Sequence, residues 1–83
     1  MDQIARTPEQ IGAAVRRRRK QMALSQEQLG ERIRFRQATI SKLEAGEPGT
    51  RLKTLLDALA ALGLELVIRP RTTATPRDIE DIF

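Results

Sequence analysis

The chain of 83 residues contains no cysteine and no histidine, and both absences restrict its chemistry. Without cysteine it can form neither disulfides nor thiolate metal sites. Without histidine it lacks the usual general base and the commonest metal ligand. Carboxylate, serine and lysine side chains remain, but the sequence groups them in no arrangement typical of catalysis. We therefore expect a protein that is not an enzyme and that needs no cofactor or metal ion.

Aromatic residues and long apolar runs are also scarce. The only aromatic residues are two phenylalanines, and no apolar run approaches the roughly 20 residues that cross a bilayer. No signal peptide is recognisable at the start, so we expect a cytoplasmic protein. The length fits one domain, which buries only about 60–65% of its unfolded surface. Association with a partner or a second copy would add burial.

Positive charge is concentrated in the middle of the chain. From Arg16 to Lys53 there are eleven basic and four acidic residues, a net charge of +7. A polyanionic partner, either nucleic acid or a membrane surface, would explain this stretch, and so would a solvated helix face. Charge alone does not decide the function.

Spacings of three and four residues between apolar positions predict the first two helices. Thr7 and Pro8 are typical of a helix start. They open a helix over residues 8–22, whose inner face comprises Ile11, Val15, Arg18 and Met22, flanked by Ala14 and Arg19. Ser25 and Gln28 have the capping-box spacing. They predict a second, short helix that buries Leu29 and Ile33.

The pattern stops at residues 34–36 and resumes over residues 37–45, with Ile40 and Leu43 on one side and Gly46 as the stop. Residues 47–50 have the composition of a turn, and Thr50 is expected to cap a fourth helix that ends at Gly63. The leucines of that helix recur at helical spacing and are expected to be core: Leu52, Leu55, Leu56, Leu59 and Leu62.

Residues 64–69 alternate between apolar and mixed positions, which predicts one short strand ended by Pro70. Leu64, Leu66 and Ile68 form its apolar face. A lone strand leaves its backbone groups unpaired. The simplest partner is the same strand of a second copy, placed antiparallel by two-fold symmetry. We therefore expect a homodimer.

Two short helices joined by a three-residue turn, between two longer helices, are typical of a helix-turn-helix. The second short helix would bury Ile40 and Leu43 and place its opposite face in the major groove of DNA. The candidate base-reading residues are Arg36, Gln37, Ala38, Ser41 and Lys42. Glutamine can bind adenine N6 and N7, and alanine can touch a thymine methyl. An ordinary solvated helix face is the alternative.

Residues 24–29 and 37–46 resemble the lambda-repressor-like, Xre-type helix-turn-helix family, with the likeness running from about Ile11 to Leu62. The resemblance implies an all-α fold of four to five helices, to which the short strand is added. It also implies that Gln26 binds phosphate and braces the first base-reading side chain. Arg19 and Glu44 match a structural ion pair of the family.

The closest subfamily resemblance is to HipB-like antitoxins, carried by residues 35–41, by a fourth helix beginning near residues 51–55, and by the strand and tail that follow. It implies a homodimer that represses its own operon and binds a HipA-like kinase toxin. DNA phosphate contacts are expected from Ser25, Gln26, Thr39, Arg51 and Lys53. Arg34 stands where the family usually has glycine, and a non-glycine residue in the left-handed region costs roughly 1 kcal/mol or somewhat more. The turn is therefore expected to be either mildly strained or shaped differently. Gly30 stands where alanine is usual and permits close packing.

These features divide the chain into an N-terminal arm (1–7), a helix-turn-helix domain (8–63), a dimerisation strand (64–69) and a flexible tail (70–83). In the tail, Ile79, Ile82 and Phe83 are candidates to dock on a protein partner. Two other functions stay open: a free-standing Xre-type repressor or an antitoxin of an unrelated toxin, and an adaptor that uses the same fold only for protein contacts.

Overall fold

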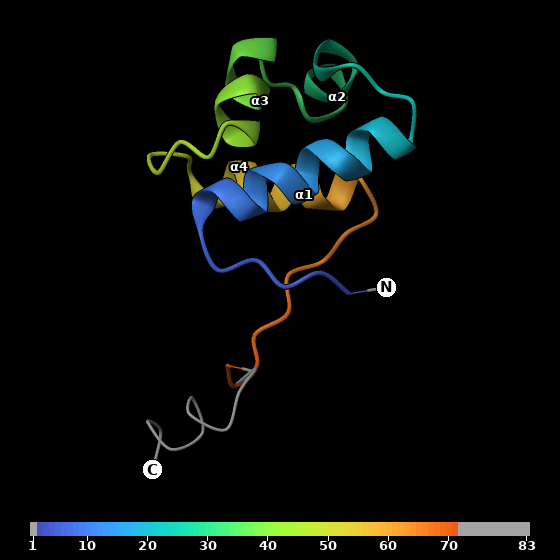
Figure 1. Ribbon diagram of the computed structural model, residues 1–83. Coiled ribbons are helices and arrows are strands. Elements are labelled where there is room, and N and C mark those ends of the chain that lie inside the picture. Colours follow the sequence, from blue (N-terminus) through green and yellow to red (C-terminus); the bar gives the residue numbers. More distant parts are fainter. Residues whose placement is uncertain (1, 72–83) are drawn as a thin grey trace.

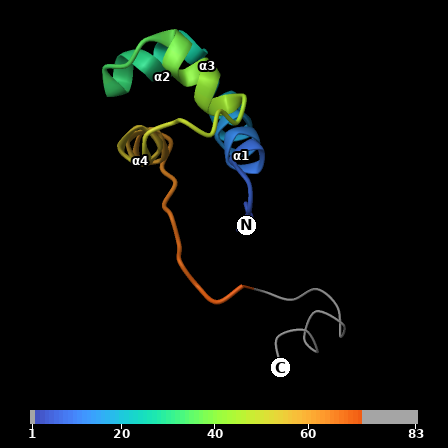
Figure 2. The same cartoon turned by 90° about the vertical axis from the view of Figure 1, so that its left-hand side faces the viewer.

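The computed structural model describes residues 2–71, which form the four helices α1 (Pro8–Gln21), α2 (Gln26–Ile33), α3 (Gln37–Glu44) and α4 (Leu52–Ala61). Helix α3 packs on α1, and α2 packs on α4. The two short helices therefore form one layer above the two longer ones (Figures 1 and 2). The predicted all-α fold is confirmed, and α1 and α3 end one residue earlier than predicted.

The first two helices begin where local hydrogen bonds stabilise them. The Thr7 hydroxyl accepts a hydrogen bond from the backbone of Gln10 at 3.1 Å, and Pro8 occupies the first helical position. Ser25 and Gln28 form a reciprocal capping box, with distances of 3.0 and 2.8 Å. Both predicted helix starts are confirmed.

Two non-glycine residues between the helices adopt the left-handed conformation. Arg34, in the turn between α2 and α3, has φ +60°, and Ala23, after α1, has φ +57°. The backbone of Phe35 then donates to the Gly30 carbonyl at 2.8 Å. A Cβ atom on Gly30 would lie 2.5 Å from the Phe35 carbonyl oxygen, so glycine permits the turn to close tightly on α2. Of the two outcomes expected at Arg34, the left-handed and mildly strained turn is the one observed. Nothing in the sequence indicated the left-handed conformation of Ala23.

The core lies where the two layers meet and comprises Val15, Leu29, Ile40, Leu43, Ala58 and Leu62. The prediction that all five leucines near α4 are core is wrong, because Leu52 is 64% and Leu56 is 43% exposed. The most deeply buried positions of α4 are the small residues Thr54 and Ala58. Small side chains allow α2 to approach closely, which turns Leu52 and Leu56 toward the surface.

The start of α4 also differs from the prediction. Its N-cap is Arg51, and Thr50 does not cap the helix. The Thr50 hydroxyl instead donates to the Glu47 carbonyl at 3.0 Å. The backbone N–H of Thr50 donates to the same carbonyl at 3.2 Å. Thr50 therefore closes the preceding turn, and the helix begins after it.

The segment after α4 leaves the helical layers as a single extension (Figures 1 and 2). Leu64 packs against the core, whereas Leu66, Val67 and Ile68 are exposed. No strand is present within residues 2–71, since a single chain offers this segment no strand to pair with. Pairing across a dimer stays a prediction. The predicted tail residues Ile79, Ile82 and Phe83 lie outside the described residues.

Candidate nucleic-acid interface

Helix α3 has one buried face and one exposed face. Ile40 and Leu43 are buried in the core. The residues predicted to read bases are all exposed on or beside α3, namely Arg36, Gln37, Ala38, Ser41 and Lys42. Arg36 is the N-cap residue and makes no side-chain cap hydrogen bond. The fold therefore leaves these side chains together on the solvent-facing side of α3, where a groove of DNA can receive them.

A buried ion pair joins α1 to the end of α3. Arg19 donates from Nε to Glu44 Oε2 at 2.7 Å and from Nη2 to Oε1 at 2.9 Å, which makes the pair bidentate. Its third nitrogen donates to the Leu24 carbonyl at 2.8 Å. The pKa of the Arg19 guanidinium is raised by its hydrogen bond with Glu44, against the opposing effect of burial. The structure thus brings together the two residues expected to pair.

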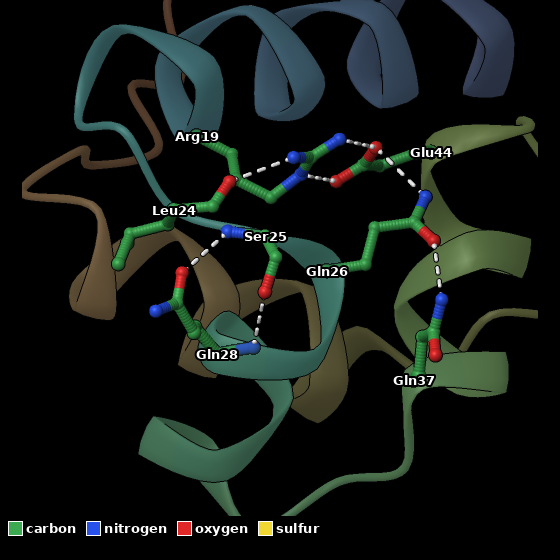
Figure 3. Close-up of polar contacts among 7 residues, drawn as sticks. All are labelled: Arg19, Leu24, Ser25, Gln26, Gln28, Gln37 and Glu44. Atoms are coloured by element: carbon green, nitrogen blue, oxygen red, sulfur yellow. Dashed lines mark hydrogen bonds and ion pairs between the residues drawn. The ribbon is translucent and has the colours of Figure 1, made fainter.

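The same carboxylate is connected to the exposed face of α3 through one glutamine. Gln26 Nε2 donates to Glu44 Oε1 at 3.2 Å. Gln37 Nε2 then donates to Gln26 Oε1 at 3.4 Å. Figure 3 shows the four side chains in a continuous row from the buried arginine to the surface. Gln26 therefore contacts Gln37 in the free chain, and Glu44 holds Gln26.

The close approach of α1 and α3 depends on a glycine. Gly12 is buried in α1, and a Cβ atom at this position would lie 2.5 Å from the Glu44 carbonyl oxygen and 2.6 Å from that of Leu43. Contacts below 3.0 Å with backbone atoms require the helices to separate. Gly12 therefore allows the spacing at which Arg19 reaches Glu44.

The candidate phosphate contacts fall into separate places. Thr39 and Arg51 line an open groove between α3 and the start of α4, together with the candidate base reader Lys42. Ser25 and Gln26 lie at the other end of the site, at the start of α2, where the Ser25 hydroxyl is already used in the capping box. Lys53 does not line the groove, and it pairs with Asp57 at 2.7 Å.

Comparisons with known proteins assign the fold to a family. A helix-turn-helix family profile matches residues 15–68, which is more than half of the chain. The chain belongs to the Xre-type helix-turn-helix family. Its Xre-type domain is a DNA-binding domain, and α3 is the second helix of the helix-turn-helix. No helix within residues 2–71 has the length and apolar character of a membrane-spanning segment.

Solved structures of HipB resemble this Xre-type domain. In a complex of a HipB variant with an O2 20mer, the likeness covers 87% of this chain and 100% of the other, at 29% identity and a TM-score of 0.80. A HipB complex with an O4 20mer and a HipA–HipB–O2–O3 complex give 30% identity, coverage of 86% and 100%, and TM-scores of 0.79. Comparison with curated protein sequences gives no match.

Sequence reasoning missed three features that position this Xre-type site: Gly12, the Leu24 carbonyl and the Gln26–Glu44 hydrogen bond. The spacing rules gave no role to Gly12, although its place one turn before Val15 on the α1 face was a usable signal. The Leu24 carbonyl and the Gln26–Glu44 hydrogen bond carry no sequence signal, because each depends on how α2 is seated. Arg18 was placed on the inner face of α1 by its spacing. Its side chain donates a hydrogen bond at 2.9 Å to the carbonyl of Leu62, the C-cap residue of α4, where carbonyls lack partners within the helix.

Proposed function

We propose that the chain is a transcriptional repressor that reads operator DNA through α3. The observation that carries this proposal is the position of Gln37, which is exposed at the start of α3 and donates a hydrogen bond to Gln26. The opposite face of α3 is buried in the core. Glutamine presented in this way suits the N6 and N7 edge of adenine. Arg36, Lys42 and Arg51 supply positive charge around it, which suits the phosphate backbone. The likeness to HipB in its 20mer complexes supports the proposal.

Salt dependence and two substitutions test DNA reading. Binding to promoter DNA should fall steeply as salt rises, because phosphate contacts release counterions. Gln37→Ala should cost roughly 1–3 kcal/mol and relax the preference at one base pair. Gln26→Ala should weaken binding more evenly across sequences. Equal losses for Gln37→Ala on specific and random DNA would remove Gln37 as a base reader. A flat salt response would favour a protein adaptor over a DNA-binding protein.

The proposed repressor is a homodimer formed through residues 64–69. The exposed Leu66, Val67 and Ile68 gain burial if the same segment of a second copy pairs with them. Two copies of α3 would then enter successive major grooves about 34 Å apart, which requires a palindromic operator. Sedimentation should show a dimer at micromolar concentration. A chain truncated after Gly63 should be monomeric, and a truncated chain that stays dimeric would exclude this interface.

We further propose that the repressor is the antitoxin of a HipBA-like operon, which it autoregulates, and that it binds a HipA-like kinase toxin. The support is the likeness to HipB over its full length in a HipA–HipB–O2–O3 complex. The product of a neighbouring kinase-like reading frame should copurify with the chain and lose its toxicity. If the chain represses its promoter but binds no such kinase, it is a free-standing Xre-type repressor or the antitoxin of an unrelated toxin.

A further inference from the structure

The row of side chains from Arg19 to Gln37 has a fixed polarity, meaning that the donor and the acceptor of each hydrogen bond are determined. A carboxylate has only acceptors and a guanidinium has only donors, so the Arg19–Glu44 pair leaves an acceptor facing Gln26. The Gln26 amide must therefore turn its nitrogen toward Glu44, at 3.2 Å. Its oxygen then faces Gln37 and accepts from Nε2 at 3.4 Å. The charge on Glu44 thus orders two amides that could each turn either way.

This polarity determines what Gln37 has left to offer DNA. One N–H of its Nε2 is occupied by Gln26, so one N–H and the Oε1 acceptor stay free. Adenine presents one acceptor, N7, and one donor, the N6 amino group, in the major groove. Guanine presents two acceptors, N7 and O6. The orientation observed at Gln37 matches adenine and opposes guanine.

We infer that Glu44 is a positioning residue for base reading, which orients Gln37 through Gln26 so that it selects adenine over guanine. This inference rests on the proposed DNA-reading function and extends it to a buried residue that touches no DNA. Glu44 lies on the last turn of α3 and Gln37 on its first, so the row joins both ends of the recognition helix through α2 (Figure 3). The buried pair then has a second role besides joining α1 to α3.

The reversed polarity gives the inference a directional test. In Arg19→Met/Glu44→Leu neither charge stays buried, and Gln26 loses the acceptor that fixes the orientation of its amide. Gln26 is then free to rotate and donate to Gln37 Oε1, which leaves both N–H groups of Gln37 free. Two donors suit the N7 and O6 acceptors of guanine. The variant should therefore shift selection at this base pair from adenine toward guanine, and loss of affinity alone would not be the expected result.

The experiment selects binding sites from a randomised double-stranded oligonucleotide library, with sequencing of the bound fraction. The base pair read by Gln37 is the one whose preference disappears in Gln37→Ala. Arg19→Met/Glu44→Leu should lower the adenine-to-guanine ratio at that pair about tenfold. Arg17→Met/Glu31→Leu is the matched control, since it makes the same two substitutions at exposed positions of α1 and α2 and should keep the wild-type ratio. Adding Arg19→Met/Glu44→Leu to Gln37→Ala should have no further effect on the ratio.

A second variant keeps the test decisive if Arg19→Met/Glu44→Leu does not fold. Gln26→Met removes the middle of the row but leaves the Arg19–Glu44 pair intact, and it too should lower the ratio. Circular dichroism shows whether each variant is folded at the temperature of selection. If the wild-type chain selects no sequence, the proposed function fails and the inference with it. If the wild type selects adenine while Arg19→Met/Glu44→Leu, or Gln26→Met where the double variant is unfolded, keeps the same ratio, the inference alone is overturned.

Discussion

Two ion pairs within the described residues have the same nitrogen–oxygen distance and very different surroundings. Arg19–Glu44 and Lys53–Asp57 are both separated by 2.7 Å. The side chains of the first pair are 9% and 3% exposed, and those of the second are 81% and 35% exposed. The first joins α1 to α3 and orders Gln26, whereas the second links one turn of α4 to the next. Distance alone therefore says little about the contribution of an ion pair.

Removing one partner of the buried pair should have the largest effect. Arg19→Met leaves the Glu44 carboxylate buried without its cation, and breaking such a pair typically costs about 3–5 kcal/mol. The double variant Arg19→Met/Glu44→Leu should recover much of that loss, because neither charge then remains buried. Denaturant unfolding measures both effects, and Arg17→Met is the control on the exposed side of α1. Equal losses in the single and double variants would contradict this reasoning.

The next largest effect should come from moving the helices that hold the buried pair. In Gly12→Ala the added methyl meets backbone carbonyls at 2.5 and 2.6 Å, which side-chain rotation cannot relieve. The strain of about 1–3 kcal/mol exceeds the gain of at most about 1 kcal/mol in helix propensity. We expect a net loss on the order of 1–2 kcal/mol in denaturant unfolding. Ala13→Gly, at an exposed position of α1, should lose only helix propensity. A stabilised Gly12→Ala would show that α1 and α3 can separate freely.

A smaller change should raise stability without touching either ion pair. Arg34 holds φ +60°, a conformation that glycine adopts at no steric cost. Arg34→Gly should therefore stabilise the chain by about 0.5–1 kcal/mol, since relief of strain outweighs the added freedom of the unfolded chain. Ala23→Gly, at φ +57°, should give a similar gain. Thermal unfolding measures both variants, and a higher midpoint temperature is expected for each. A lower midpoint in either variant would show that the residue replaced there is not a source of strain.

The sequence predicted what local rules determine and missed what packing determines. Caps at Thr7 and Ser25 and the stop at Gly46 involve neighbours within a turn, so these helix boundaries were predictable. The polar outer face of α3 followed from spacing alone. The exposure of Leu52 could not be predicted from spacing, because it depends on which side of α4 meets α2. The Gln26–Glu44 hydrogen bond could not be predicted either, because it joins side chains on different helices and depends on how those helices pack.

The smallest effect is expected at the exposed pair. Lys53→Gln keeps a good helix former and removes one i, i+4 pair, which is worth about 0.3–0.5 kcal/mol and is weakened further by salt. Unfolding in low and high salt should therefore differ little between Lys53→Gln and the wild type. If Lys53 also binds DNA phosphate, it must release Asp57 to do so, and Lys53→Gln should reduce the slope of log affinity against log salt by about 1. Asp57→Asn should then bind DNA slightly more tightly, because the lysine no longer has to leave a partner. An unchanged slope in Lys53→Gln would remove Lys53 from the phosphate contacts and leave Arg51 as the cation at the start of α4.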